Sequence, residues 1–147
     1  PTELDDESGQ KIRDRGRVYR TMTGRPRRCG WFDAVAARYT IRLSGITHVA
    51  VMHLDTLGTF DRVGICTGYR VGGKVLHTFV ADANVVESVE PVIEFMSGGH
   101  EDLSKARSID DLPKTARDYL DRVESLIEAP ITIVSVGPER TQTLFRA

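Results

Sequence analysis

The stretch TMTGRPRRCGW (21–31) is the part of the sequence whose residue types most clearly could do chemistry. Its glycine and proline, Gly24 and Pro26, keep it out of regular structure. A guanidinium group presents paired N–H donors that match the oxygens of a carboxylate or a phosphate. We therefore predict a local anion-binding loop formed by Arg25, Arg27 and Arg28.

The surroundings of this loop affect how it would hold an anion. A helix is predicted to begin just after it, and a helix amino terminus offers free N–H groups and the positive end of its dipole. Thr21 and Thr23 would add hydroxyl donors. The alternative is an exposed charged loop whose arginines pair with acids such as Asp33.

Two further stretches carry polar groups at predicted strand ends. Asp55 closes the valine-rich run THVAVMHLD (47–55), and ligands of open α/β sheets sit beyond the carboxyl ends of the strands. A carboxylate there can accept the two parallel N–H bonds that guanine offers and adenine does not, although a capping or turn aspartate is the commoner explanation. His53 is interpreted as a core or edge histidine. The run SVGP (135–138) brings backbone groups close to a planar ligand, or merely ends its strand.

The elements that must position these residues follow from hydrophobic periodicity. The first 17 residues are interpreted as a polar surface segment with weak helical tendency, and 82–111 as mixed structure with a loop at Gly98-Gly99. A mixed, mainly parallel sheet with flanking helices is expected, which is an α/β fold. The predicted helices are 31–44 and about 113–127, and the predicted strands are 47–55, 61–71, 74–81 and 131–135.

Composition limits the function classes. The chain has 147 residues, 40% hydrophobic and 28% charged, with a formal net charge of -1. This fits one domain with its own core, and it argues against a protein that coats nucleic acid, which usually carries a basic surplus. The two cysteines, Cys29 and Cys66, match no metal or redox spacing. No apolar run of about 18 residues occurs, so we expect a soluble, cytoplasmic protein without membrane contact.

Taken in order, these motifs resemble the adenylosuccinate synthetase family. The resemblance rests on TMTGRPRRCGW (21–31), HLD (53–55) and SVGPER (135–140). It extends through PTEL at the start, ICTGYR (65–70), DLPKTARDYL (111–120) and the closing RTQT (140–143). It implies a ligase that uses GTP to join IMP and L-aspartate, giving adenylosuccinate, GDP and phosphate in purine (AMP) biosynthesis.

The resemblance also implies roles for individual residues. Arg25 would reach aspartate and the IMP side, Arg27 would bridge toward GTP, and Asp55 would select guanine. The implied aspartate and IMP loop consists of Thr21, Met22, Thr23, Gly24, Arg25, Pro26 and Arg27. The implied GTP-binding residues are Arg27, His53, Leu54, Asp55, Ser135, Val136 and Gly137.

The family's glycine-rich phosphate loop, GDEGKGK-like, does not occur in this sequence. We therefore expect residues 1–147 to be the carboxy-terminal substrate- and guanine-binding portion, inactive alone, with no catalytic residue and no metal ligand of its own. The Mg²⁺ ligands would lie in the amino-terminal part, and the resemblance implies a homodimer for the full-length enzyme.

Several positions depart from the family pattern and leave alternatives open. Arg20 and Met22 replace a glycine and a threonine in the substrate loop, and His53 replaces the lysine of KLD. A diverged paralogue with another amino acid or purine substrate is one alternative, and a stand-alone nucleotide- or anion-binding module is another. RNA binding through the arginines is disfavoured by the near-neutral charge and the few aromatic residues.

Overall fold

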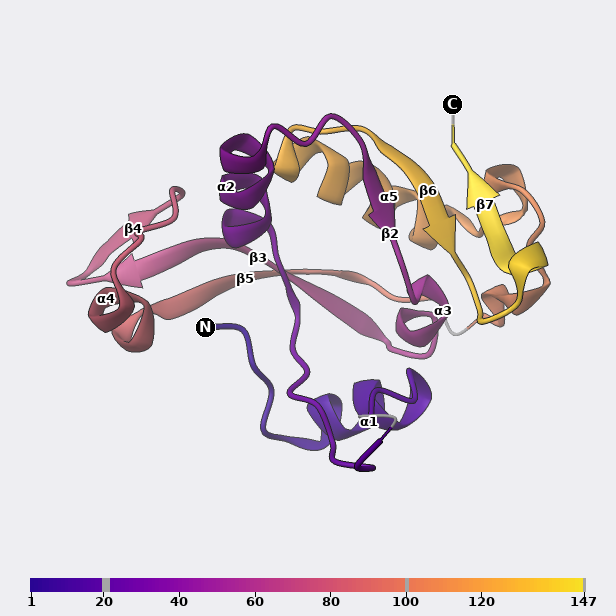
Figure 1. The fold of residues 1–147 in the computed structure, drawn as a ribbon, viewed down its shortest axis with the longest axis horizontal. Helices are drawn as coiled ribbons and strands as arrows, with labels where there is room; N and C mark the ends of the chain where they lie inside the picture. The colour runs from indigo at the N-terminus through magenta and orange to yellow at the C-terminus, as the bar shows by residue number, and fades with distance from the viewer. Residues whose placement is uncertain (20–21, 100, 147) are drawn as a thin grey trace.

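The computed structural model describes residues 1–19, 22–99 and 101–146, and Figure 1 shows their arrangement. The helices are α1 (Glu7–Arg15), α2 (Ala34–Ser44), α3 (Leu54–Leu57), α4 (Ala83–Ser88) and α5 (Lys114–Ile127). The strands are β1 (Phe32–Asp33), β2 (Val49–Val51), β3 (Arg62–Val71), β4 (Lys74–Leu76), β5 (Glu90–Ser97), β6 (Ile131–Ser135) and β7 (Thr143–Phe145). Three short 3-10 helices are η1 (Leu103–Lys105), η2 (Ile109–Asp111) and η3 (Arg140–Gln142).

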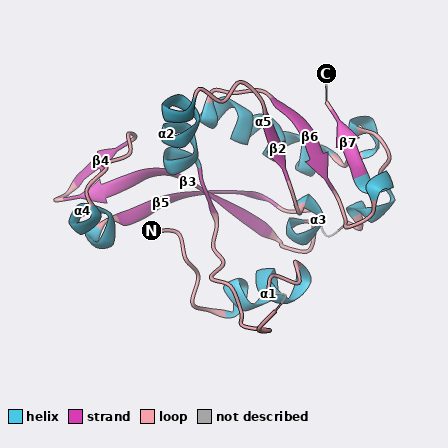
Figure 2. Ribbon diagram, in the orientation of Figure 1, coloured by secondary structure: helices cyan, strands magenta, loops and turns pink. Residues whose placement is uncertain are grey.

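The strands form two sheets, which Figure 2 distinguishes from the helices around them. In the larger sheet, β3 pairs with β1 in parallel and with β4 and β5 in antiparallel register. In the smaller sheet, β6 lies between the parallel strand β2 and the antiparallel strand β7. The mixed α/β class is confirmed. Because β2 and β6 are parallel, their carboxyl ends meet at one edge, toward α3 (Figure 1).

Several predicted elements are confirmed with small changes of their bounds. The helix expected at about 113–127 is α5, whose residues Leu120, Val123 and Ile127 are buried as the apolar periodicity requires. The helix expected over 31–44 begins later, at Ala34. Phe32 and Asp33 instead pair with β3, and the Asp33 carboxylate accepts a hydrogen bond from the Ala36 N–H at 3.0 Å.

Other expectations are wrong. Residues Glu7–Arg15 of the amino-terminal segment form the helix α1, with Asp6 accepting from the N–H groups of Ser8 and Gly9. The strand predicted over 47–55 spans only Val49–Val51, because His53 takes a left-handed backbone (φ 60°) and a short helix follows it. That strand is half-buried rather than fully buried, and the strand predicted over 74–81 ends at Leu76.

The core lies between the sheets and α5, and a smaller cluster lies beneath α2. The main cluster includes Trp31, Leu54 and Ile65, and the smaller one contains Cys66 and Tyr69. Tyr69 is fully buried, and its hydroxyl donates to Asp33 Oδ2 at 2.6 Å, so β3 is tied to the start of α2. Burial and this carboxylate raise the pKa of Tyr69.

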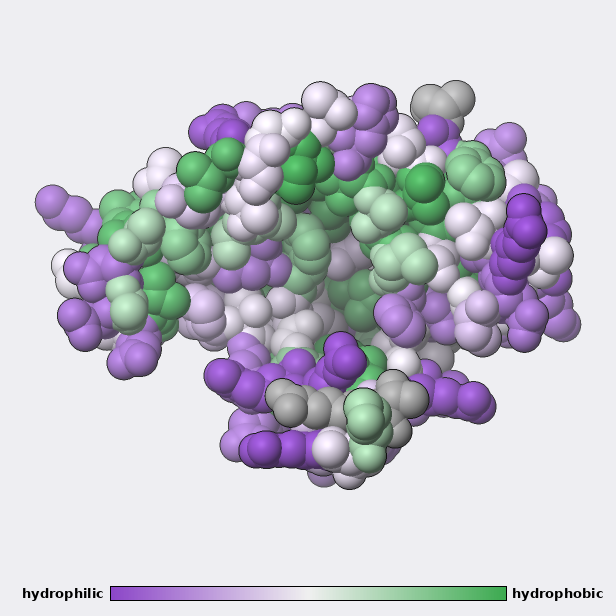
Figure 3. Space-filling view, in the orientation of Figure 1, coloured by the Kyte–Doolittle hydropathy of each residue, from purple (hydrophilic) through white to green (hydrophobic). Residues whose placement is uncertain are grey.

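Surface character divides along the fold. In Figure 3, hydrophilic residues gather over the α1 layer, whereas hydrophobic residues cover much of the region of β2, β6 and α2. Exposed hydrophobic side chains include Leu43 of α2, Met52 just after β2, and Phe145 of the neighbouring strand β7. Within the described residues, the helices are too short and too polar to cross a bilayer.

Candidate functional site

The arginine loop packs against α1 rather than standing free. The Arg27 N–H donates to the Val18 carbonyl at 3.1 Å, and Tyr19 and Pro26 form an isolated antiparallel bridge. From α1, Arg13 Nε donates to the Arg27 carbonyl at 2.9 Å. Gly24 supplies the turn with a φ of 62°. The loop is therefore held by backbone contacts that leave its side chains exposed.

The structure separates the three arginines of the predicted anion site. Arg28 Nε donates to Glu3 Oε2 at 2.6 Å, and its Nη2 forms an ion pair with the same oxygen. The Arg28 guanidinium in turn holds the pKa of Glu3 below its usual range. Arg25 and Arg27 are exposed and have no acidic partner among the described residues. These two guanidinium groups are the ones free to take an anion.

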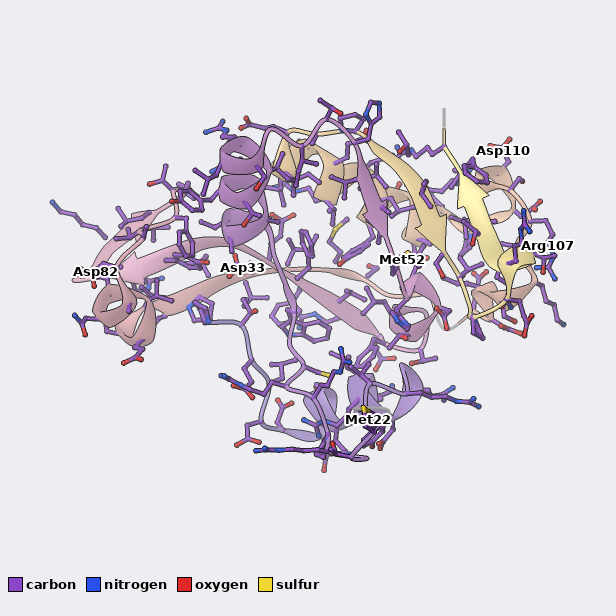
Figure 4. The ribbon with its side chains drawn as sticks, in the orientation of Figure 1. Met22, Asp33, Met52, Asp82, Arg107 and Asp110 are labelled. Atoms are coloured by element: carbon purple, nitrogen blue, oxygen red, sulfur yellow. The ribbon has the colours of Figure 1, made fainter. Side chains whose placement is uncertain are left out.

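The loop borders a pocket of about 460 Å³ lined by Arg25, Pro26, Arg27 and Arg28. Thr23 Oγ1 accepts from the Arg25 N–H at 3.4 Å, and Met22 is 99% exposed. Figure 4 shows Met22 beside α1, far from Asp33 at the foot of α2. Thr21, also expected in this loop, lies outside the described residues.

One part of the loop prediction is wrong. The α2 amino terminus was expected to add its N–H groups to the anion site, but the Asp33 carboxylate already caps it. Asp33 also accepts from the buried Tyr69, and no ion pair between Asp33 and an arginine occurs in the described parts of the chain. An anion bound at this loop would therefore be held by guanidinium groups and not by the amino terminus of α2.

Asp55 lies in the first turn of α3, at the edge where β2 and β6 end. It lines an open pocket of about 420 Å³, together with Arg15, Thr56, Thr59, Glu101, Asp102, Leu103 and Ser104. Asp55 Oδ1 is buried and has no hydrogen-bond partner among the described residues. Buried polar atoms are nearly always paired, so this carboxylate is one that a donor from outside the chain would satisfy.

The two residues before Asp55 are placed differently from each other. His53 is exposed and lies beyond the end of β2, so it is not a core histidine. Leu54 is 2% exposed and packs in the main core. Only the backbone of Leu54 can therefore face a ligand, whereas the imidazole of His53 is accessible.

The turn after β6 lies near α3, with Val136 and Leu54 in the same core cluster. Ser135 and Val136 are buried, and the Ser135 hydroxyl donates to the Gly137 carbonyl at 2.9 Å. A Cβ atom added at Gly137 would overlap the side-chain amide of Gln142. The turn can therefore offer backbone groups to a planar ligand, but its Ser135 and Val136 side chains face inward.

Helix α1 connects the arginine loop to the Asp55 pocket. It holds the loop through Arg13, as described above, and Lys11 Nζ donates to the Thr59 carbonyl at 2.7 Å. Arg15, near the end of the helix, lines the Asp55 pocket. The two halves of the candidate site are therefore neighbours on opposite sides of one helix.

Sequence reasoning missed several residues of this site. Glu3, Arg15 and Ser104 carried no spacing signal, because each reaches the site from another part of the chain. Gln142 was noticed only as part of RTQT (140–143). In the described parts of the chain, no three His, Cys, Asp or Glu side chains are placed to hold a metal ion.

Comparisons with known proteins agree on one family. The family profile described as adenylosuccinate synthetase matches residues 1–144. Adenylosuccinate synthetase of Desulfitobacterium hafniense is 47% identical over 146 residues, covering 99% of this chain. The enzyme of Desulfatibacillum aliphaticivorans is 50% identical over 144 residues, covering 98% of this chain.

A comparison with a solved structure extends the similarity from the sequence to the fold. The structure of fully ligated adenylosuccinate synthetase from Plasmodium falciparum matches with a TM-score of 0.93 at 32% identity, covering 99% of this chain and 35% of that one. The chain spans 34% of the length of the curated relatives it matches. The profile match, the sequence identity and the shared fold together show that this chain belongs to the adenylosuccinate synthetase family.

Proposed function

We propose that residues 1–147 supply the substrate-binding and guanine-binding surfaces of a ligase that uses GTP to join IMP and L-aspartate, giving adenylosuccinate, GDP and phosphate. The observation that carries this proposal is Asp55. Asp55 of this chain, which belongs to the family, presents its carboxylate to an open pocket. One oxygen of that carboxylate is buried and has no hydrogen-bond partner among the described residues.

Guanine fits this carboxylate by its donor pattern. Its ring N1–H and its 2-amino group point the same way, so they can donate to both oxygens of Asp55. Adenine presents an unprotonated ring nitrogen at the corresponding position and would leave the carboxylate unpaired. A buried carboxylate left without a hydrogen-bond donor weakens binding strongly, so Asp55 would select GTP over ATP. The backbone of His53 and Leu54, and of the Ser135–Gly137 turn, would flank the base.

The arginine loop fits the other substrates by charge. L-Aspartate carries two carboxylates, and IMP carries a phosphate. Arg25 and Arg27 are the exposed guanidinium groups of the loop, and Thr23 fixes the Arg25 backbone. Arg25 would bind aspartate on the IMP side, and Arg27, held by Arg13 of α1, would extend toward GTP.

Turnover needs more than binding. In this family the γ-phosphate passes to the 6-oxygen of IMP before the aspartate amine displaces it, and phosphoryl transfer depends on charge neutralisation around that phosphate. The residues described here provide no ligand set for Mg²⁺, whose place therefore stays a prediction. We propose that the purified 147-residue chain binds nucleotide but does not turn over IMP, aspartate and GTP. A cytoplasmic homodimer is proposed for the complete enzyme.

Replacing Asp55 by asparagine tests the proposal in the native protein that carries this chain. Asp55→Asn places an amide where guanine needs an acceptor, and the loss of two charge-assisted hydrogen bonds raises the KM for GTP by about 100-fold or more. Xanthosine triphosphate, which has a carbonyl in place of the 2-amino group, becomes the better nucleotide. Steady-state rates with each nucleotide measure the ratio.

The matched control is Asp110→Asn, an exposed acid of η2 that does not line the Asp55 pocket and that Figure 4 shows beside β7. It should leave both KM values unchanged. A GTP-to-xanthosine-triphosphate preference that is the same in Asp55→Asn and in the wild type would refute the guanine assignment.

An altered amino-acid specificity is the second candidate. Met22 is 99% exposed in the loop, at a position where the resemblance implies a threonine. Its lost hydroxyl removes one donor for a carboxylate. Rates with L-aspartate compared with other amino acids, in the wild type and in Met22→Thr, test this candidate, which fails if the substitution leaves every ratio unchanged.

A further inference from the structure

We infer that Gln142 is a positioning residue that holds two walls of the guanine pocket at a fixed separation, an inference that rests on the proposed function. One wall contains Asp55 of α3 with the segment 101–104. The other wall, which the proposed function assigns to the base, is the turn Ser135–Gly137 after β6, whose strand contacts α3. The two walls come from distant parts of the chain, so their separation is set by tertiary contacts.

Gln142 is built into the turn through its backbone and its side chain. The Val136 N–H donates to the Gln142 carbonyl at 2.9 Å, and the Gln142 N–H donates to the Glu139 carbonyl at 2.9 Å. Its side-chain Oε1 accepts from the Glu139 N–H at 2.9 Å. Gly137 passes so close to this amide that no Cβ atom fits between them. The amide is therefore fixed relative to the turn.

The other end of the same amide reaches the Asp55 wall. Gln142 Nε2 donates to the Ser104 carbonyl at 3.0 Å. Ser104 lines the Asp55 pocket, and the Glu101 N–H of the same segment donates to the Gly58 carbonyl at the end of α3 at 3.1 Å. One hydrogen bond thus ties the end of α3 to segment 101–104, and the Gln142 amide ties the same segment to the turn.

Stability alone does not account for this amide. The Ser104 carbonyl also accepts from Arg107 Nη1 at 2.9 Å, so it keeps a donor without Gln142. Glu139 is exposed, and water can satisfy its N–H. Removing the amide would leave no buried group unpaired and would mainly release one wall from the other.

Gln142→Leu, of similar volume but without the amide, tests this in the native protein that carries the chain. Without the amide, part of the binding free energy of the nucleotide would be spent on fixing the two walls. The KM for GTP should therefore rise about tenfold, which corresponds to the free energy of one or two hydrogen bonds. The KM for inosine triphosphate should rise by the same factor, since the 2-amino group is not involved. The kcat and the KM for IMP should stay unchanged.

Thr141→Val is the control, because Thr141 is exposed in the same short helix and its side chain makes no hydrogen bond within the described residues. It should leave all constants unchanged. If Gln142→Leu fails to fold, Gly137→Ala tests the same contact by forcing the turn away from the amide, with the same expected rise for both nucleotides.

Three results would overturn the inference. An unchanged KM for GTP in Gln142→Leu, in a protein where Asp55→Asn still switches base preference, refutes only the role of Gln142. An equal rise of the KM values for GTP and IMP in Gln142→Leu indicates general destabilisation and also refutes the inference. A wild-type protein with no saturable response to GTP refutes the proposed function and this inference together.

Discussion

The division among the arginines leads to a prediction that compares two neighbouring substitutions. Arg25→Gln and Arg28→Gln remove the same charge from the same loop. Arg28 already donates to Glu3, whereas Arg25 has no acidic partner in the described chain. If the loop binds aspartate, the two substitutions must differ in their effect on the KM for aspartate.

The size of the difference follows from the contacts. A hydrogen bond between charged groups contributes about 1.5–3 kcal/mol, and each 1.4 kcal/mol is tenfold in affinity. Loss of the Arg25 contact should therefore raise the KM for aspartate by about 10- to 150-fold. Arg28→Gln removes a guanidinium that already donates to Glu3, so only an indirect effect of about 1 kcal/mol or less is expected, which is less than about fivefold in this KM.

Initial rates of the native protein that carries this chain, at saturating IMP and GTP with varied aspartate, give both values. Glu3→Gln serves as a further control, because it should reproduce the small effect of Arg28→Gln. A larger loss in Arg28→Gln than in Arg25→Gln would show that the Glu3 contact does not withdraw Arg28 from the site, and the reasoning would fail.

Three further predictions concern the scaffold. Tyr69→Phe removes the buried hydrogen bond to Asp33 and should lower the free energy of unfolding by about 2 kcal/mol in denaturant titrations. Tyr39→Phe is the control, because the Tyr39 ring stacks on Phe79, and it should have almost no effect. Equal losses of unfolding free energy in the two variants would contradict this prediction. Burial raises the pKa of Cys66 to about 11, so mass spectrometry after brief alkylation of the folded protein should find Cys29 modified first, and early labelling of Cys66 would be inconsistent with its burial. Arg122 holds the pKa of Glu94 below its ordinary value of 4.5, so this pair stabilises the fold above pH 4.5 and is lost as the pH falls through the lowered pKa. The destabilisation by Glu94→Gln should therefore shrink between pH 7 and pH 3, and a constant difference would refute the assignment.

Local patterns in the sequence were sufficient for the elements whose burial is periodic or continuous. The apolar face of α5 repeats at helical spacing, and β6 is a short apolar run, so both lie close to their predicted positions. Gly72-Gly73 marks the hairpin between β3 and β4, because both residues have positive φ. Helix α1 was not predicted, because the amino-terminal segment is polar and charged. Contacts with other segments of the chain stabilise this helix.

The candidate site shows the same division between what local sequence patterns predict and what tertiary contacts decide. The sequence alone determined the motifs and hence the family, and it indicated Arg25, Arg27 and Asp55 as the groups able to bind substrates. Only the tertiary structure decided that Arg28 is occupied by Glu3, that Asp33 caps α2, and that Gln142 spans from the turn to Ser104. Residue types and local spacing determine which groups can bind or donate. Which of them remain free depends on contacts between distant segments, and these form only when the chain folds.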